Sequence, residues 1–192
     1  MEMERVIHED KTFKNIKHSG KETTNNEFEH CSFLNCDFSN GAFTSGKFID
    51  CVFTGCNLSM VKLTSCQLNN VIFKDCKLLG VNFFECNDFL FNVKFDGSVL
   101  DYCSFVRKKI PKTIFLNTSM KSVDFTECDL TKSTFDNADL MNAVFYKSIL
   151  KEVDFVTALN YTIDPEFNNI KKAKFSLMGI HGLLEKYDIQ IE

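Results

Sequence analysis

The chain has 192 residues and a formal net charge of −4, so it can form one sizeable domain, and its mildly acidic balance argues against nucleic acid as a direct partner. No stretch is long and apolar enough to span a membrane, and the charged start, MEMERVIHED, is unlike a signal peptide. We therefore expect a soluble, cytoplasmic protein without a membrane partner, whose nine cysteines stay reduced.

The first segment, residues 1–27, follows the repeat of the later chain poorly. Phe13 fits the repeat, but His18 and Thr23 are poor replacements for its large apolar residue. The end of a solenoid is an open sheet edge that needs a cover. We therefore predict that this segment caps the fold, with a strand in 6–16 and a turn in 18–25.

A repeat of five residues runs through 28–175. The large apolar residue of each unit, which we call the centre, is usually Phe or Leu, and a small residue lies two positions before it. The centres of the first block are Phe28, Phe33, Phe38, Phe43, Phe48, Phe53, Leu58, Leu63, Leu68, Phe73, Leu78 and Phe83. The pattern slips by two residues within 84–92 and resumes at Leu90.

A period of five fits neither an α-helix nor a flat strand, so each unit must turn the chain by about a right angle. Four units then close a square, and centres that are four units apart share one side. With the slip allowed for, one side carries only phenylalanine, which favours vertical stacking of rings. Its centres are Phe33, Phe53, Phe73, Phe95, Phe115, Phe135, Phe155 and Phe175.

The slip at 84–92 adds three aromatic residues, Phe84, Phe89 and Phe91, of which one or two at most fit inside the coil. Two interpretations are open. The segment is either a bulge that presents an apolar contact patch or a bulge that its own side chains cover.

A basic cluster follows in 106–113, formed by Arg107, Lys108, Lys109 and Lys112. Lys108 falls at an inward position, where an unpaired ammonium is very costly, so either the backbone deforms or the side chain escapes. The cluster is either a contact site for an acidic partner or a solvated irregularity.

The last segment, 176–192, leaves the repeat. Ser176 is a suitable N-cap for a short α-helix, in which Ile180, Leu183, Leu184 and Tyr187 form one apolar stripe, and a short strand at 189–191 follows. We predict that this element either caps the solenoid or joins two copies into a homodimer through those four residues.

Eight of the nine cysteines lie two residues before a centre, which is the inward small position, and Cys86 does so in the phase of the first block if the slip follows it. A zinc site needs ligands that converge on one point, and the four histidines are scattered. Disulfides between stacked cysteines remain the second alternative, although a reducing compartment favours free thiols. No nucleotide loop or nucleophile motif is present, so we expect neither catalysis nor a cofactor nor a metal.

The unit of a small residue, a polar residue, Leu or Phe and two polar residues resembles the pentapeptide-repeat family over residues 26–175. The resemblance implies an all-β, right-handed, four-sided β-helix. The plan of a charged start, two blocks, a bulge and a C-terminal helix is similar to the quinolone-resistance (Qnr-type) and MfpA-type branch. That branch implies a non-catalytic dimer that mimics DNA and binds bacterial gyrase or topoisomerase IV, with possible fluoroquinolone protection.

The candidate binding residues are the outward carboxylates of the second block, Asp124, Asp129, Asp139 and Asp154, together with Arg107, Lys108 and Lys109. Duplex DNA carries a phosphate charge every ~1.7 Å, which a net charge of −4 cannot match globally. The alternative is a general protein-interaction scaffold without a topoisomerase role.

Overall fold

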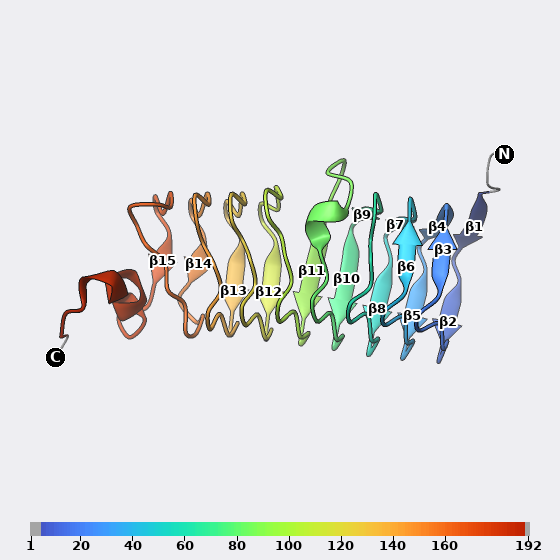
Figure 1. Ribbon diagram of the computed structural model, residues 1–192, viewed down its shortest axis with the longest axis horizontal. Helices are drawn as coiled ribbons and strands as arrows, with labels where there is room; N and C mark the ends of the chain where they lie inside the picture. The colour runs from blue at the N-terminus through green and yellow to red at the C-terminus, as the bar shows by residue number, and fades with distance from the viewer. Residues whose placement is uncertain (1–4, 191–192) are drawn as a thin grey trace.

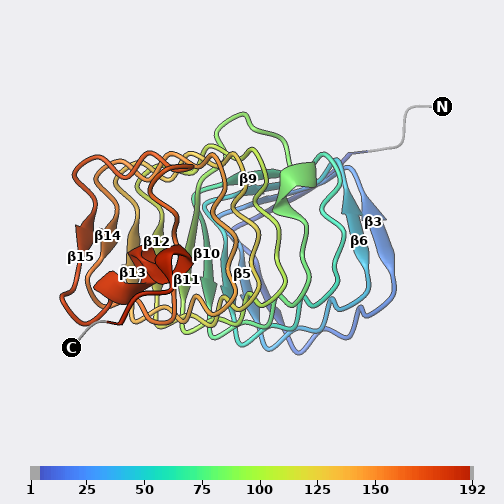
Figure 2. The ribbon, with the colours of Figure 1, turned by 60° about the vertical axis from the view of Figure 1, so that its left-hand side comes forward.

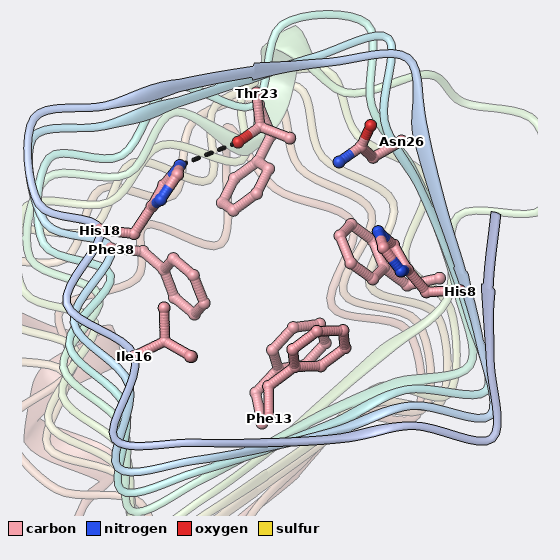
Figure 3. A pocket seen from close by; sticks show the side chains of 10 residues that line it. His8, Phe13, Ile16, His18, Thr23, Asn26 and Phe38 are labelled. Atoms are coloured by element: carbon pink, nitrogen blue, oxygen red, sulfur yellow. Dashed lines mark hydrogen bonds between the residues drawn. The ribbon is translucent and has the colours of Figure 1, made fainter. Parts of the chain in front are cut away.

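The computed structural model describes residues 5–190 as a long stack of coils, with the two chain ends at opposite ends of the stack (Figure 1). Successive coils pair through parallel strands and lie one behind another in the oblique view of Figure 2. The view along the stack in Figure 3 shows that each coil has four sides. The predicted four-sided β-solenoid is confirmed. Within the described residues no helix is both long enough and apolar enough to cross a membrane.

One side of the solenoid carries the phenylalanine column. Its parallel sheet of nine strands consists of β2 (Thr12–Lys14), β5 (Ser32–Leu34), β8 (Val52–Thr54), β10 (Val71–Lys74), β11 (Val93–Asp96), β12 (Ile114–Leu116), β13 (Thr134–Asp136), β14 (Asp154–Phe155) and β15 (Lys174–Phe175). All eight predicted rings are stacked, and Phe13 adds a ninth. The register advances by four complete units at each step except from Phe73 to Phe95, so the predicted slip is also confirmed.

The other sides are paired less regularly. One has a four-stranded sheet of β1 (Val6–Glu9), β4 (Asn26–Glu29), β7 (Lys47–Ile49) and β9 (Gln67–Asn69), and another pairs β3 (Glu22–Thr24) with β6 (Ala42–Thr44). The remaining contacts between coils are single parallel bridges, such as that between Lys77 and Val99. The centres and the small residues before them form one continuous buried core.

The corners of the square explain the polar residues of the repeat. The second residue after a centre adopts the left-handed conformation, as in Asn35 (φ 52°), Ser45 (54°) and Asp50 (53°). This turn is costly for most side chains but is tolerated by Gly, Asn and Asp. Where Arg107 and Lys112 occupy corners, both with φ of 60°, the neighbouring coils impose the conformation.

At the slip, the structure shows that one residue predicted to lie in the core is exposed instead. Leu90 is 54% exposed and lies at a left-handed position with φ of 55°, so it is not a centre. Phe91 is buried in its place, and the short 3₁₀ helix η1 (Phe83–Glu85) leads into the bulge. An inserted segment has several apolar side chains that compete for one inward position, and the five-residue count alone selected the wrong one.

The N-terminal segment is a coil and not a strand laid over one. His8 pairs with Phe28, Phe13 with Phe33 and Thr23 with Phe43, each pair separated by one full turn of the coil. The described part of 1–27 therefore continues the sides of the solenoid, and residue 28 marks no structural break. Residues 1–4 of the expected cap lie outside the described residues.

The C-terminal segment corrects the predicted α-helix. It forms two 3₁₀ turns, η2 (Ile180–Leu183) and η3 (Glu185–Tyr187). Ser176 Oγ accepts the Gly179 N–H at 3.0 Å, as expected of a cap, but the chain then packs tightly on Tyr161, where a Cβ on Gly182 would clash with the carbonyl oxygen. Two glycines and this close contact disfavour a continuous helix. Ile189 and Gln190 form no strand, and residue 191 of the expected strand lies outside the described residues.

Candidate functional site: the loop and the surfaces around it

The segment 84–92 projects from the coil beside η1 (Figure 1, green). Phe84, Phe89 and Leu90 are 49%, 66% and 54% exposed, and we call these three residues the loop patch. Phe91 turns inward, with its ring 6.4 Å from that of Phe83. The bulge thus presents apolar surface instead of covering it, which decides between the two interpretations of its sequence.

Lys108 does not join the basic cluster on the surface. Its side chain is buried, and Nζ donates hydrogen bonds to the Cys86 carbonyl oxygen at 2.5 Å and to Asp88 Oδ1 at 2.6 Å. The ammonium group also lies 4.9 Å from the centre of the Phe91 ring. The side chain has stayed inside the solenoid because the bulge supplies it with an anion and a carbonyl.

The other basic residues of the cluster lie on the outside. Arg107 occupies a corner and donates from Nε to Glu127 Oε2 at 2.8 Å. Lys109 and Lys112 are exposed and have no ion-pair partner within residues 5–190. The structure therefore divides the predicted site into one buried lysine and three solvent-facing basic groups.

The four predicted carboxylates do not form one surface, because each belongs to a different side of the square. Asp154 lies in β14, whereas Asp124, Asp129 and Asp139 bridge to three separate ladders, at Ser104, Lys109 and Ser119. Each Oδ1 accepts the N–H of the residue two positions later, at 2.8 to 3.2 Å. These aspartates therefore stabilise the corners of their own coils.

Asp139 has the strongest set of partners among the four. Partial burial would raise its pKa, but hydrogen bonds from Asn160, the Met141 N–H and Lys121 together lower it below the usual value. The carboxylate is therefore charged throughout the neutral range, although much of its hydrogen-bonding capacity is already used.

Sequence reasoning missed a row of lysines beside Asp129. It follows one side and corner over successive coils, and Glu152 lies within the row, 3.6 Å from Lys132 and 3.7 Å from Lys151. The lysines are Lys109, Lys112, Lys132, Lys151, Lys171 and Lys172. Their recurrence at whole turns of the coil was the available signal, and the row makes this part of the surface basic.

An apolar hollow lies at the N-terminal end of the described coils (Figure 3). It has a volume of about 220 Å³, and His8, Phe13, Ile16 and His18 point into it from the first coil. His18 Nε2 lies 3.0 Å from Thr23 Oγ1, the one hydrogen bond drawn across its wall. Within residues 5–190 no three His, Cys, Asp or Glu side chains are placed to hold a metal. The hollow is the end of the core, and its surface is mainly apolar.

The C-terminal end exposes more apolar surface than the predicted stripe. Ile180 and Tyr187 are 41% and 52% exposed, Leu184 is half-buried, and Leu183 packs against the core. Leu177 and Met178 are each 88% exposed, and the sequence analysis did not select them. Their position directly after the last repeat, where no inward place remains for them, was the signal.

Comparisons with known proteins agree with this geometry. Family models described as "Pentapeptide repeat region" and "Pentapeptide repeats (8 copies)" match residues 26–105 and 118–156, together more than half of the chain. No curated protein matches the sequence.

Two solved structures of QnrB1, described as a plasmid-mediated fluoroquinolone resistance protein, are similar to the chain. Both are trypsin-treated forms with one substitution, and each has a TM-score of 0.63 at 14% identity. Both matches cover 98% of this chain, and they cover 100% and 98% of the respective QnrB1 chains. HetL, a pentapeptide repeat protein involved in heterocyst differentiation regulation from the cyanobacterium Nostoc, matches with a TM-score of 0.44 at 14% identity, over 88% of this chain and 87% of its own. The repeat of five, the four-sided coil and both family models identify this chain as a member of the pentapeptide-repeat family.

Proposed function

We propose that this protein is a non-catalytic binding protein whose partner is a bacterial type II topoisomerase, gyrase above all. The observation that carries the proposal is the fold similarity to QnrB1 along the whole of both chains. QnrB1 is described as a fluoroquinolone resistance protein. A target of these drugs, such as gyrase, is therefore the partner that the similarity suggests first. The filled core of the solenoid also suits surface recognition better than catalysis.

The contact surface in this proposal is the loop patch with the coils next to it. Phe84, Phe89 and Leu90 form an exposed apolar group on a projecting segment that also carries the charged residues Glu85 and Asp88. Apolar residues inside a polar rim are typical of protein-binding surfaces.

The charge distribution supports DNA mimicry less well than the Qnr-type resemblance implies. The four aspartates lie on four sides, and the lysine row occupies the side of Asp129, so no single side of the second block carries all four carboxylates. This mixed surface favours the second candidate, a protein-interaction scaffold with another partner.

We infer further that the protein is a homodimer joined at its C-terminal end. The exposed residues Leu177 and Met178 extend the predicted group of Ile180, Leu183, Leu184 and Tyr187. Within this group, Leu183 packs against the core and stabilises the C-terminal end. Burial of such exposed side chains in a twofold contact is favourable by about 25 cal/mol per Å² of apolar area.

The test is a supercoiling assay with gyrase from the same organism, with and without a fluoroquinolone. We expect the protein to alter supercoiling or relieve drug inhibition, and the variant Phe84→Ser/Phe89→Ser/Leu90→Ser to lose the effect. Met60→Ser, which changes a residue 58% exposed on another part of the coil, is the matched control. Absence of any effect and of any binding to gyrase or topoisomerase IV at tens of micromolar protein would leave the scaffold with another partner.

A further inference from the structure

Lys108 occupies a position that in the two coils before it and the two coils after it belongs to small side chains. The equivalent residues are Cys66 and Cys86 before it and Cys128 and Ser148 after it. The side chain of Lys108 is only 3% exposed, so its ammonium group depends on partners inside the protein. A buried charge without such partners is strongly unfavourable.

All three partners of this ammonium group belong to the bulge. The Cys86 carbonyl oxygen is at its start, Asp88 Oδ1 is near its middle and the Phe91 ring is at its end. One side chain thus connects the beginning, middle and end of the segment. The extra length of the slip allows the chain to curve around Nζ, so the insertion and the lysine complement each other.

The backbone of the bulge has few other connections. Asn87 and Asn92 donate their N–H groups to the Cys66 and Leu68 carbonyls of the neighbouring coil. Between them, within the described residues, the Phe91 N–H donates to the Asp88 carbonyl oxygen at 3.3 Å and the Phe89 N–H donates to Asn87 Oδ1 at 2.9 Å, and both bonds stay within the loop itself. In a regular unit, backbone hydrogen bonds between neighbouring coils would hold these residues in place. In the bulge, the contacts of the Lys108 side chain replace those hydrogen bonds.

We propose that Lys108 is the latch that fixes the conformation of the 86–91 loop and so presents Phe89 and Leu90 of the loop patch as a preformed binding surface. The loop is exposed, yet its conformation is set from inside the core by a residue of the following coil. Preorganisation of this kind reduces the ordering cost of binding. The structural part of the proposal concerns this chain alone, and only the role of the patch in binding rests on the proposed function.

The test compares four full-length variants by hydrogen exchange of peptides covering 84–94. Lys108→Met keeps an unbranched side chain of similar length and removes the charge, and Asp88→Asn removes the carboxylate from an exposed loop residue. Lys109→Met removes the same charge from the neighbouring exposed lysine and is the matched control. The double variant Lys108→Met/Asp88→Asn completes a cycle that isolates the pair.

Because hydrogen bonds to charged groups contribute more than neutral ones, we expect exchange in the loop to accelerate about tenfold or more in Lys108→Met and in Asp88→Asn. Exchange in the coils further away should be unchanged, and Lys109→Met should match the unmodified protein. Asp88→Asn leaves the buried ammonium without its anion, so it should lower the Tm on its own but not when added to Lys108→Met. Unchanged loop exchange in both single variants would overturn the latch.

The same variants separate the latch from the proposed function. If the loop loosens in Lys108→Met and the effect on gyrase falls with it, both parts are supported. If the loop loosens while an effect on gyrase persists, the latch holds but its role in presenting the patch is wrong. If the unmodified protein has no effect on gyrase, the proposed partner is wrong, and the exchange data still decide the latch.

Discussion

At the scale of single residues, the stability of this protein depends on what occupies the inward positions of each coil. Phe115 is fully buried, and its ring stacks on those of Phe95 at 5.5 Å and Phe135 at 4.8 Å. Offset stacks of this kind add to the energy of burial, and the neighbouring coils hold the rings at nearly one strand spacing.

Phe115→Ala should destabilise the solenoid by about 3 to 5 kcal/mol, because it removes a buried ring and leaves a cavity that paired backbones cannot close. Urea unfolding followed by circular dichroism measures the change. Phe89→Ala, at a position 66% exposed, should cost no more than about 0.5 kcal/mol. Equal losses in the two variants would contradict the assignment of inward and outward positions.

The cysteines belong to the same scale, since all nine are free thiols at buried inward positions. Burial raises the pKa of Cys51, Cys66 and Cys103 to about 12, which suppresses the reactive thiolate. We expect a thiol reagent at pH 8 to find few reactive groups in the folded protein and nine after unfolding without reductant. A shortfall of two after unfolding would indicate a disulfide.

At the scale of the element, the first coil differs from those that follow. His8 stacks on Phe28 with ring centres 4.9 Å apart, and His18 occupies the position of Phe38 in the next coil. Partial burial, assisted by Lys11 and Lys21 respectively, lowers the pKa of both histidines below 6.5. The folded coil therefore favours the neutral imidazoles.

A base with a lowered pKa in the folded state makes stability depend on pH in one direction. The unfolded coil binds more protons than the folded coil below about pH 6.5, so this contribution is complete above that pH and declines as the pH falls through the folded-state values. We expect amide hydrogen exchange in residues 6–24 to accelerate as the pH falls from 7.5 to 5, after the measured rates are corrected for the intrinsic pH dependence of exchange.

The variant His8→Phe/His18→Phe should abolish this dependence and place one phenylalanine ring next to Phe28 and another next to Phe38. A first coil that loses the same protection at pH 5 in the variant and in the unmodified protein would show that other groups cause the change.

At the scale of the whole molecule, the two ends have different surfaces. The N-terminal end exposes the core through the hollow in Figure 3, whereas the C-terminal end is covered by η2 and η3 and carries exposed apolar side chains. A twofold contact uses the same surface on both copies, so the exposed apolar group at the C-terminal end is suited to join two copies end to end.

Leu177→Glu/Met178→Glu should convert the proposed dimer into a folded monomer, because paired copies would then bury carboxylates without partners. Light scattering coupled to size exclusion measures the mass, and circular dichroism confirms that the coil persists. Met60→Glu is the control, since it adds a charge at an exposed position away from this end. A dimer that survives the double substitution would move the interface elsewhere.

The sequence by itself determined the side chains of the solenoid's interior. A strict period of five admits one simple geometry, and the identity of centres four units apart located the phenylalanine column without any structure. The inward and outward positions can be read within each five-residue unit. The prediction of the interior therefore depends only on a local pattern, which the chain repeats many times. The resemblance to the pentapeptide-repeat family rested on the same positions.

The tertiary structure decided what happens where the pattern breaks. It selected Phe91 over Leu90 for the core, drew Lys108 inward to Asp88, placed His8 and His18 in a first coil and replaced the expected helix by turns against Tyr161. At each of these sites the sequence allows more than one arrangement. The arrangement that forms depends on packing against a neighbouring coil, which is a full turn away along the chain and is defined only in the folded structure.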